Sequence, residues 1–403
     1  MRGIASFVTK QLGVEVGHSW VADLLGRAGH AARVILAEYF RPLARDVDLD
    51  EIFLAAKPLL LVVEPRSHVI HWGVLAEDRS VASWRATLEG MSLLERVTSD
   101  RGTSIIAACR ELGIARQSDL FHAVREVGRA VRAAEDAAYR QLRAYYDAEK
   151  SYLKQWDHDP SDLRPAAQRL RRFREETDAF LERFDGLEAE ARRFRDAFEF
   201  TRSSGCFQSA RYARQLAGHL VARLRASRPT GFRRAINAIE DRRLYYYLEE
   251  LEAAIASAPL GSADGKERSR IAACAFQLWL DVRSAQAARG TKDAAVESRL
   301  GLRTVAFRLL VARLGGDAVR AVETLFGAFD AIHRSSSAVE CVNGRLRLFQ
   351  QTRHHLANDF FYLLALHHNI TPFRGGKRAG RSPADILGVK LPTTDLATLL
   401  GVL

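Results

Sequence analysis

Glu340 lies in a basic stretch of the chain, residues 335–389, in which seven Lys and Arg outnumber three Asp and Glu. Polar residues around it recur at offsets of three and four, which puts them on one face of a helix: Ser336, Glu340, Asn343 and Arg347. That face offers an acid, an amide and a cation. An isolated carboxylate among arginines suggests a metal ligand that faces a phosphate backbone. A solvated amphipathic helix with an incidental ion pair is the alternative.

The order of residues in the same stretch is distinctive. It reads S-S-x-x-E-x-x-N-x-x-L-R, then R-H-x-L, an aromatic-rich helix and H-N-x-x-P-F-R-G-G-K-R-A-G-x-S-P-x-x-x-L-G. This order resembles the C-terminal catalytic segment of bacterial insertion-sequence transposases of the DDE type, which have a ribonuclease H-like core. The resemblance implies that Glu340 is the last acid of a metal-binding triad. It also implies two aspartates upstream, one inside a first strand and one at the end of a later strand.

Two aspartates fit the first of these positions. Alternation along an expected strand puts Asp48 and Asp50 on one side of it. The resemblance selects Asp50, because D-E-I-F followed by an apolar strand that ends in V-E-P matches the family's context. Asp48 is the fallback and Glu64 a weaker one. An ordinary turn or strand-edge carboxylate is the structural explanation for any of the three.

Asp100 fits the second position, because it follows L-E-R-V-T-S and precedes R-G-T-S. An aspartate between a strand and a helix is often an N-cap. The carboxyl ends of strands are also where open α/β sheets place their ligands. The first and fourth strands are neighbours in a ribonuclease H-like core, so the resemblance implies that Asp50 and Asp100 meet.

Three carboxylates from distant parts of the chain suit two Mg²⁺ ions, for which Mn²⁺ can substitute, because both metals prefer oxygen ligands. Two such ions clamp an in-line displacement at phosphorus. The resemblance therefore implies that Asp50, Asp100 and Glu340 are catalytic metal ligands of a DNA transposase. Its reactions would be cleavage of transposon ends and strand transfer into target DNA. The family also implies an oligomer, at least a dimer on DNA.

Basic residues near Glu340 are candidate DNA contacts. Asn343 and Arg347 share its helix face and are expected to contact phosphates of the cleaved strand. The remaining candidates follow the backbone from further along the basic stretch: Arg353, Lys377, Arg378 and Arg381. A flexible basic C-terminal tail is the alternative for the last three.

Composition is compatible with this interpretation. The 403 residues include 60 Lys and Arg against 49 Asp and Glu, which gives a net charge of +11 and favours a polyanionic partner, nucleic acid first. Four scattered cysteines indicate neither a zinc ribbon nor a disulfide framework. The chain shows no signal-peptide pattern and no apolar run of the roughly 18 residues that span a bilayer. We expect a cytoplasmic, nucleoid-associated protein without a membrane partner.

Residues 45–124 alternate apolar runs with turns, in the order of three strands, a helix and a fourth strand. R-G-T-S-I-I-A-A-C-R-E-L-G and Q-S-D-L-F-H-A-V then fit a helix and a short fifth strand. This order predicts an α/β fold with a mixed sheet, the first part of a ribonuclease H-like core. Residues 333–403 would supply its last part together with the basic tail.

Residues 125–332 are almost continuously helical in pattern, so we expect an all-helical insertion in the core. Within it, Trp279 could stack on a flipped base, with packing in a helical core as the alternative. Residues 1–44 predict a helix-turn-helix-like DNA-binding segment whose second helix, about Ser19 to Ala28, enters a groove. A generic helical hairpin fits equally. The pattern starts abruptly, as expected of a module truncated upstream of Met1.

The sequence thus favours a DDE transposase. A catalytically inactive or truncated DNA-binding protein derived from a transposable element is the alternative. It would keep the basic surface and lose the activity, so metal dependence of DNA cleavage separates the two.

Overall fold

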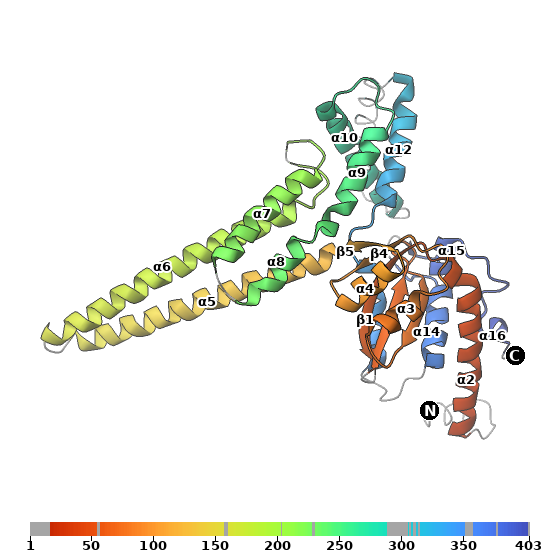
Figure 1. The fold of residues 1–403 in the computed structure, drawn as a ribbon, viewed down its shortest axis with the longest axis horizontal. Coiled ribbons are helices and arrows are strands. Elements are labelled where there is room, and N and C mark those ends of the chain that lie inside the picture. Colours follow the sequence, from red (N-terminus) through yellow and green to blue (C-terminus); the bar gives the residue numbers. More distant parts are fainter. Residues whose placement is uncertain are drawn as a thin grey trace. The chain divides into compact units, whose positions relative to one another are not determined.

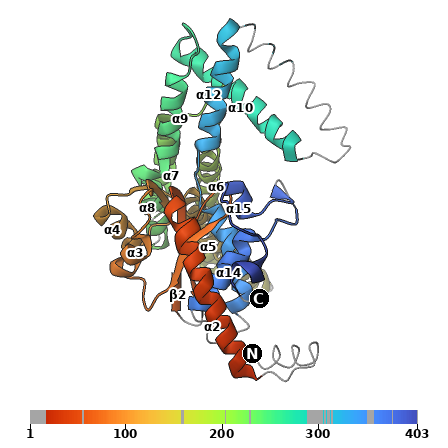
Figure 2. The ribbon, with the colours of Figure 1, turned by 90° about the vertical axis from the view of Figure 1, so that its right-hand side faces the viewer.

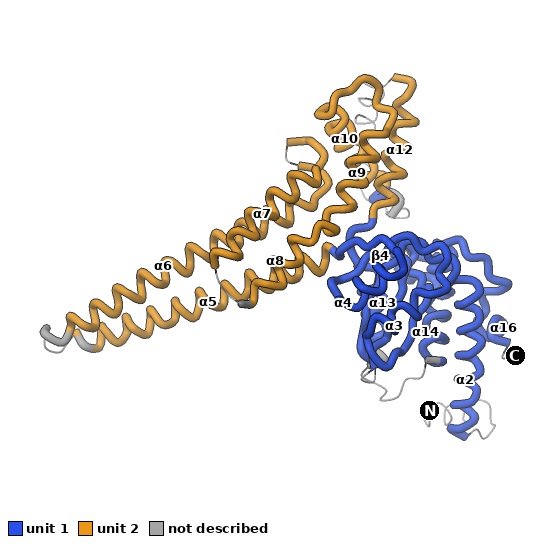
Figure 3. Tube along the Cα trace, in the orientation of Figure 1, with its two compact units in different colours: residues 1–119, 283–296, 333–403 blue, residues 120–282, 297–332 orange. Residues whose placement is uncertain are grey.

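The computed structural model of Figure 1 describes most of the chain: residues 17–54, 57–156, 160–202, 204–227, 230–287, 305, 308, 312, 315–350, 358–375 and 378–401. The chain divides into two compact units, coloured in Figure 3. The first unit combines three segments: Met1–Asp119, Arg283–Val296 and His333–Leu403. The second combines two: Leu120–Val282 and Glu297–Ile332.

Five strands form one mixed sheet in the first unit, in the order β3-β2-β1-β4-β5. Their bounds are β1 (Asp46–Leu54), β2 (Lys57–Val63), β3 (Ile70–Leu75), β4 (Arg96–Ser99) and β5 (Ala115–Ser118). β1 pairs antiparallel with β2, and β2 with β3. β1 and β4 run parallel, as do β4 and β5. A three-strand meander is therefore extended by two parallel strands.

Helices cover both faces of this sheet. Their bounds are α2 (His18–Ile35), α3 (Val81–Leu88), α4 (Thr103–Glu111), α13 (Ser337–Gln350), α14 (Asn358–Ile370), α15 (Pro383–Leu387) and α16 (Leu396–Leu399), with short turns η1 (Leu36–Phe40) and η2 (Arg41–Leu43). α3 and α4 contact each other on one side of the sheet, and α14 lies on the other (Figure 2). α13 contacts β1 and β2, and α14 contacts β3. Coverage on both faces explains why β2 is buried from Pro58 to Val63.

The expected mixed sheet, followed by a large helical region, is confirmed. The first four strands and α3 lie where the sequence pattern predicted them. The fifth strand was predicted too far along the chain: Q-S-D-L-F-H-A-V spans residues 117–124, whereas β5 runs over Ala115–Ser118 and Leu120 already begins a helix. The reason is visible in the sequence, because L-F-H-A-V continues into the apolar spacing of a long helix, not into strand alternation.

The helix predicted from about Ser19 belongs to the core of the first unit. α2 extends to Ile35 and buries Ala28, Gly29 and Ala32. Gly29 lies so close to α14 that an added Cβ would meet the Asp359 carbonyl oxygen at 2.2 Å. Only glycine permits this approach. The helix expected before Gly13 lies outside the described residues, so the helix-turn-helix interpretation stays a prediction.

The second unit is helical throughout its described residues, apart from an isolated bridge between Thr201 and Phe207. Its elements are α5 (Leu120–Gln155), α6 (Pro160–Asp196), α7 (Ala210–Ala226), η3 (Thr230–Phe232), α8 (Arg233–Ile239), η4 (Arg242–Tyr245), α9 (Tyr246–Ser257), α10 (Gly265–Ala287), η5 (Gly315–Asp317) and α12 (Ala318–Ala331). α5 and α6 form a long hairpin (Figure 1). Among the described helices, none combines the length and apolarity needed to cross a membrane.

Trp279 packs in a helical core of this unit. Its ring centroid lies 5.5 Å from that of Phe276 and 6.1 Å from that of Phe329. Its indole Nε1 donates a hydrogen bond of 3.0 Å to Asp330 Oδ1. The ring and its polar edge therefore both have partners within the unit, as the packing alternative predicts.

The H-N element of the C-terminal stretch ties α14 to the turn between β2 and β3. Asn369 is fully buried, accepts a hydrogen bond from the Ile70 amide and donates one to the Ile70 carbonyl, both at 2.9 Å. The side-chain amide thus pairs a residue of the edge strand as a neighbouring strand would. The His368 ring contacts the His68 carbonyl at 2.8 Å. Arg378 donates two bonds, of 2.9 and 2.7 Å, to the Arg66 carbonyl.

Replacing Asn369 with alanine should lower the free energy of unfolding by about 2–4 kcal/mol, because it leaves two buried backbone groups of Ile70 without partners. Urea unfolding of the purified chain measures this loss. His367→Ala, at the exposed neighbouring position, is the control and should cost less than about 1 kcal/mol. Equal losses in the two variants would contradict the pairing role of Asn369.

Burial lowers the pKa of His368 from its ordinary value of 6.5 to about 4. The folded state therefore resists protonation, and stability present above pH 6.5 should be lost as the pH falls toward 4. The full effect is at most about 3 kcal/mol. Unfolding free energies of the natural chain and of His368→Gln, compared across this window, should converge at low pH. Parallel pH profiles would contradict the prediction.

Candidate functional site

Three aspartates lie level with one another on the three adjacent strands β1, β4 and β5, at the point where β4 and β5 end. In the parallel register, Leu49 pairs with Ser99, and Ser99 pairs with Ser118. The next residue on each strand is an aspartate: Asp50, Asp100 and Asp119. Asp50 is still part of β1, whereas Asp100 and Asp119 follow their strands directly. The edge where open α/β sheets bind ligands is thus lined by carboxylates.

Asp50 is held by α13. Asn343 Nδ2 donates a hydrogen bond of 2.7 Å to Asp50 Oδ2, and the Glu51 amide donates one of 2.8 Å to Oδ1. The Asn343 side chain is fully buried. Its amide therefore faces the carboxylate and the sheet, where the sequence had suggested a contact to DNA phosphates.

Asp119 anchors the start of α13. The Ser336 backbone amide donates a 3.1 Å hydrogen bond to Asp119 Oδ1, and the Ser336 hydroxyl donates to Oδ2. Both residues are buried, and Ser336 immediately precedes the helix. A carboxylate that accepts two hydrogen bonds at a helix N-terminus also compensates the positive end of the helix dipole.

Glu340 lies on α13 between these two anchors. It follows Ser336 by four residues and precedes Asn343 by three, so the three residues share the helix face that meets the strand ends. Arg347 Nη2 lies 3.6 Å from Glu340 Oε2, and the Glu340 side chain is 23% exposed. The face with an acid, an amide and a cation is therefore present as predicted. Its amide and serine bind aspartates of the sheet.

Asp100 lies at the turn between β4 and α4. Its Oδ1 accepts a 2.8 Å hydrogen bond from the Gly102 amide, and its carbonyl accepts one of 3.1 Å from Arg116. The N-cap residue of α4 is Gly102, without a side-chain cap. Asp100 thus shapes the turn and is not the N-cap that the sequence offered as the alternative.

Asp48 faces the same side of the sheet as Asp50 and is completely buried. His333 Nε2 hydrogen-bonds to Asp48 Oδ1. Gln117 Nε2 in turn donates a hydrogen bond of 2.6 Å to the His333 carbonyl. Burial raises the pKa of Asp48 to about 6, against the lowering effect of His333; the nearby Asp119 carboxylate raises it further. Asp48 is therefore linked electrostatically to the aspartate edge.

Glu64, the weaker candidate for the first acid, closes its own loop. Its Oε2 accepts hydrogen bonds from the Arg66 amide at 2.9 Å and from the Ser67 hydroxyl at 2.6 Å. These bonds stabilise the turn to which His368 and Arg378 bind. A structural role accounts for this acid.

The donor atoms at this edge suit Mg²⁺ in kind, because they are carboxylate and amide oxygens. Three buried oxygens there have no hydrogen-bond partner within the described part of the chain: Asp48 Oδ2, Gln117 Oε1 and Asn343 Oδ1. Such atoms require a water molecule or a cation. However, no group of three His, Cys, Asp or Glu side chains that could hold a metal ion occurs among the described residues. The metal-binding role of Asp50, Asp100 and Glu340 therefore stays a prediction.

The other predicted DNA contacts are dispersed. Arg347 is exposed beside Glu340. Arg378 is occupied by the Arg66 carbonyl, and Arg381 Nη2 lies 3.4 Å from the Asp385 carbonyl oxygen. Arg353 and Lys377 lie outside the described residues. Of the six predicted contacts, Arg347 and Arg381 are thus the exposed cations for which the structure gives a position.

Sequence reasoning missed Asp119, His333 and Gln117. A signal existed for Asp119, since D-L-F-H follows a strand pattern and places a carboxylate where a strand gives way to a helix. His333 and Gln117 carry no such signal. Their contacts join positions more than 200 residues apart, and the spacing of one segment cannot reveal such pairs.

Asp119→Ala and Ser336→Ala should each destabilise the chain, by about 2–3 kcal/mol for Asp119, because a buried donor loses a charged acceptor. In a double-mutant cycle, their coupling free energy should exceed about 1 kcal/mol. The exposed pair Asp395 and Thr398, which makes the same two hydrogen bonds on α16, is the matched control with a coupling below about 0.5 kcal/mol. Additive effects for Asp119 and Ser336 would show that α13 is not anchored there.

Comparison with known proteins adds no assignment to this geometry. Neither the protein-family models, nor the curated proteins, nor the solved structures contain a match to the chain. The family resemblance drawn from the C-terminal stretch therefore stays a prediction, and the arguments about function rest on the residues described above.

Proposed function

We propose that the chain is a DNA transposase of the DDE type with a ribonuclease H-like catalytic unit. One observation carries the proposal: Asp119 holds the start of α13 and Asp50 binds Asn343 of the same helix, with Glu340 between these anchors. An acid is thereby held beside the edge that carries Asp50 and Asp100. This is the relation that the sequence resemblance requires of the three acids.

Two further features support the proposal. The strand order β3-β2-β1-β4-β5, with an antiparallel meander followed by parallel strands, is the order expected of a ribonuclease H-like sheet. The net charge of +11 favours a polyanionic substrate. Neither feature depends on the C-terminal sequence motif.

In this proposal, Asp50, Asp100 and Glu340 would hold Mg²⁺, which would supply an activated nucleophile and stabilise the leaving oxygen. Asp50 and Asp100 must change partners for this, since Asp50 is bound by Asn343 and Asp100 by the Gly102 amide. Asn343 is well suited to such an exchange, because its unpaired Oδ1 lies beside the Nδ2 that now holds Asp50. The chain's own contribution is to position the acids and to bind DNA.

The second candidate is a DNA-binding protein without strand-cleavage activity. The hydrogen bond from Asn343 to Asp50, together with the lack of a three-carboxylate group among the residues that the structure describes, favours it. Such a protein would keep the basic surface. It would bind DNA in a salt-sensitive way without any need for divalent metal.

Glu340→Gln should abolish Mg²⁺- or Mn²⁺-dependent nicking of DNA that carries the sequences flanking the gene, with a rate loss of roughly a hundredfold or more. The change keeps the size of the side chain and removes its charge. Nicking of end-labelled duplexes, with identification of the 3′-hydroxyl product, measures the effect. Glu111→Gln, which removes an exposed acid from α4, is the control and should cleave normally.

Retained cleavage by Glu340→Gln would refute the catalytic role of this acid. Absence of cleavage in every variant, including the natural chain, together with intact salt-dependent DNA binding, would instead favour the inactive DNA-binding protein. Binding measured in EDTA keeps these two outcomes separate.

A further inference from the structure

One face of α5 in the helical unit carries large side chains that are more than half exposed to solvent. Tyr139, Tyr146 and Leu153 are 61%, 57% and 60% exposed. They are spaced by seven residues, so they form a row along one side of the helix. Exposed apolar rows of this length call for a partner.

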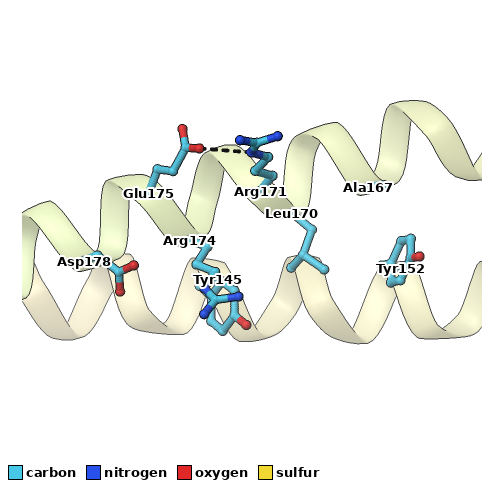
Figure 4. A pocket seen from close by; sticks show the side chains of 8 residues that line it. All are labelled: Tyr145, Tyr152, Ala167, Leu170, Arg171, Arg174, Glu175 and Asp178. Atoms are coloured by element: carbon cyan, nitrogen blue, oxygen red, sulfur yellow. Dashed lines mark hydrogen bonds and ion pairs between the residues drawn. The ribbon is translucent and has the colours of Figure 1, made fainter.

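Other tyrosines of the same helix pack within the hairpin. Tyr145 and Tyr152 line a cavity of about 460 Å³ between α5 and α6, together with Leu170 and Arg174 (Figure 4). Tyr145 and Tyr152 are half-buried, whereas Tyr139 and Tyr146 are exposed. Their exposure is not explained by packing within this unit.

Cations lie beside this row. Arg143 follows Tyr139 by four residues, and Lys150 follows Tyr146 by four, so each exposed tyrosine has a cation on the next helical turn. Arg132 and Lys154 extend the cationic row in both directions, and all four cations are exposed. Within the part of the chain that the structure describes, none of the four has an ion pair. We call this set the α5 face: Arg132, Tyr139, Arg143, Tyr146, Lys150 and Lys154.

The neighbouring helix shows the contrasting pattern. On α6, Arg171 pairs with Glu175 at 3.1 Å and Arg172 with Glu176 at 2.9 Å. These exposed cations are neutralised by acids four residues away. On the α5 face, the acids Glu135, Asp136 and Asp147 leave a net charge of +1, because four cations face three acids.

The charge and the length of the face decide between partners. A second copy of α5 would bring like charges together, which opposes pairing along the row. From Arg132 to Lys154 the helix rises by about 33 Å, close to the roughly 34–36 Å of one turn of B-DNA. The backbone of one DNA turn presents a series of phosphates along this length. Lysine and arginine side chains bind phosphates, and tyrosine hydroxyls also donate hydrogen bonds to them.

We propose that the α5 face is a docking surface for double-stranded DNA. Its cations contact phosphates and its tyrosines donate to the backbone, so the contact is independent of base sequence. The choice of DNA as the polyanion rests on the proposed function, whereas the docking itself requires no catalysis.

The test is binding of a 30-base-pair duplex by the full chain in EDTA, over a series of salt concentrations. Arg143→Glu/Lys150→Glu should weaken binding at least tenfold and lower the salt slope by roughly two. Arg143→Ala/Lys150→Ala should do the same to a smaller extent. Arg171→Glu/Arg172→Glu is the matched control, since it also changes the net charge from +11 to +7 but alters cations that are already paired. It should change binding less than threefold.

Equal loss in the α5 and α6 variants, or unchanged binding in both α5 variants, overturns the proposal. A change in oligomeric state without a change in DNA affinity overturns it in favour of a second copy of the chain, and sedimentation velocity detects that outcome. Circular dichroism melting shows that each variant is folded. The binding assay is done in EDTA, without metal, whereas the cleavage assay requires metal. A negative result in one assay therefore does not decide the outcome of the other.

Discussion

The attachment of α13 to the carboxyl ends of the strands is the constraint on which the candidate site depends. The helix comes from a segment that follows β5 by more than 200 residues, yet Asp119 and Asp50 hold it at two points. Each contact joins a carboxylate to a donor on the helix face that also carries Glu340. Buried charge-assisted hydrogen bonds strongly favour one position of the helix, because a buried donor that loses its acceptor lowers the stability of the folded state. The large helical unit can therefore stand between β5 and α13 in the sequence without displacing the acid.

Burial of polar groups is concentrated at this same edge. Asp48 hydrogen-bonds to the His333 ring through Oδ1, and Gln117 donates through Nε2 to the His333 carbonyl. Among the residues that the structure describes, Asp48 Oδ2, Gln117 Oε1 and Asn343 Oδ1 have no hydrogen-bond partner. Replacing buried polar contacts of this kind with apolar packing is often neutral or stabilising. Unsatisfied buried oxygens around a row of aspartates are typical of a site that waits for a ligand. Buried oxygens without partners beside Asp50, Asp100 and Asp119 therefore favour a functional explanation of this region over a purely structural one.

Much of the fold could be predicted, because apolar alternation and turn residues fix strands locally. The helix face of Glu340 and Asn343 could be predicted for the same reason, from offsets of three and four. What the face does could not. Asn343 binds Asp50 and Ser336 binds Asp119 across the sheet, and such long-range pairs leave no periodic trace. The end of β5 was misjudged because apolar residues beyond Asp119 fit a strand and a helix alike over a short window.

The central claim is that Asp50, Asp100 and Glu340 converge on a metal ion when DNA is bound. Iron-mediated cleavage of the protein tests it directly: Fe²⁺ replaces Mg²⁺, ascorbate and peroxide generate hydroxyl radicals at the bound ion, and the fragments are mapped. With DNA present, cuts should cluster at the end of β1, at the end of β4 and in the first turns of α13, and excess Mg²⁺ should suppress them. Cuts at only one of these segments, or at none, would contradict the account.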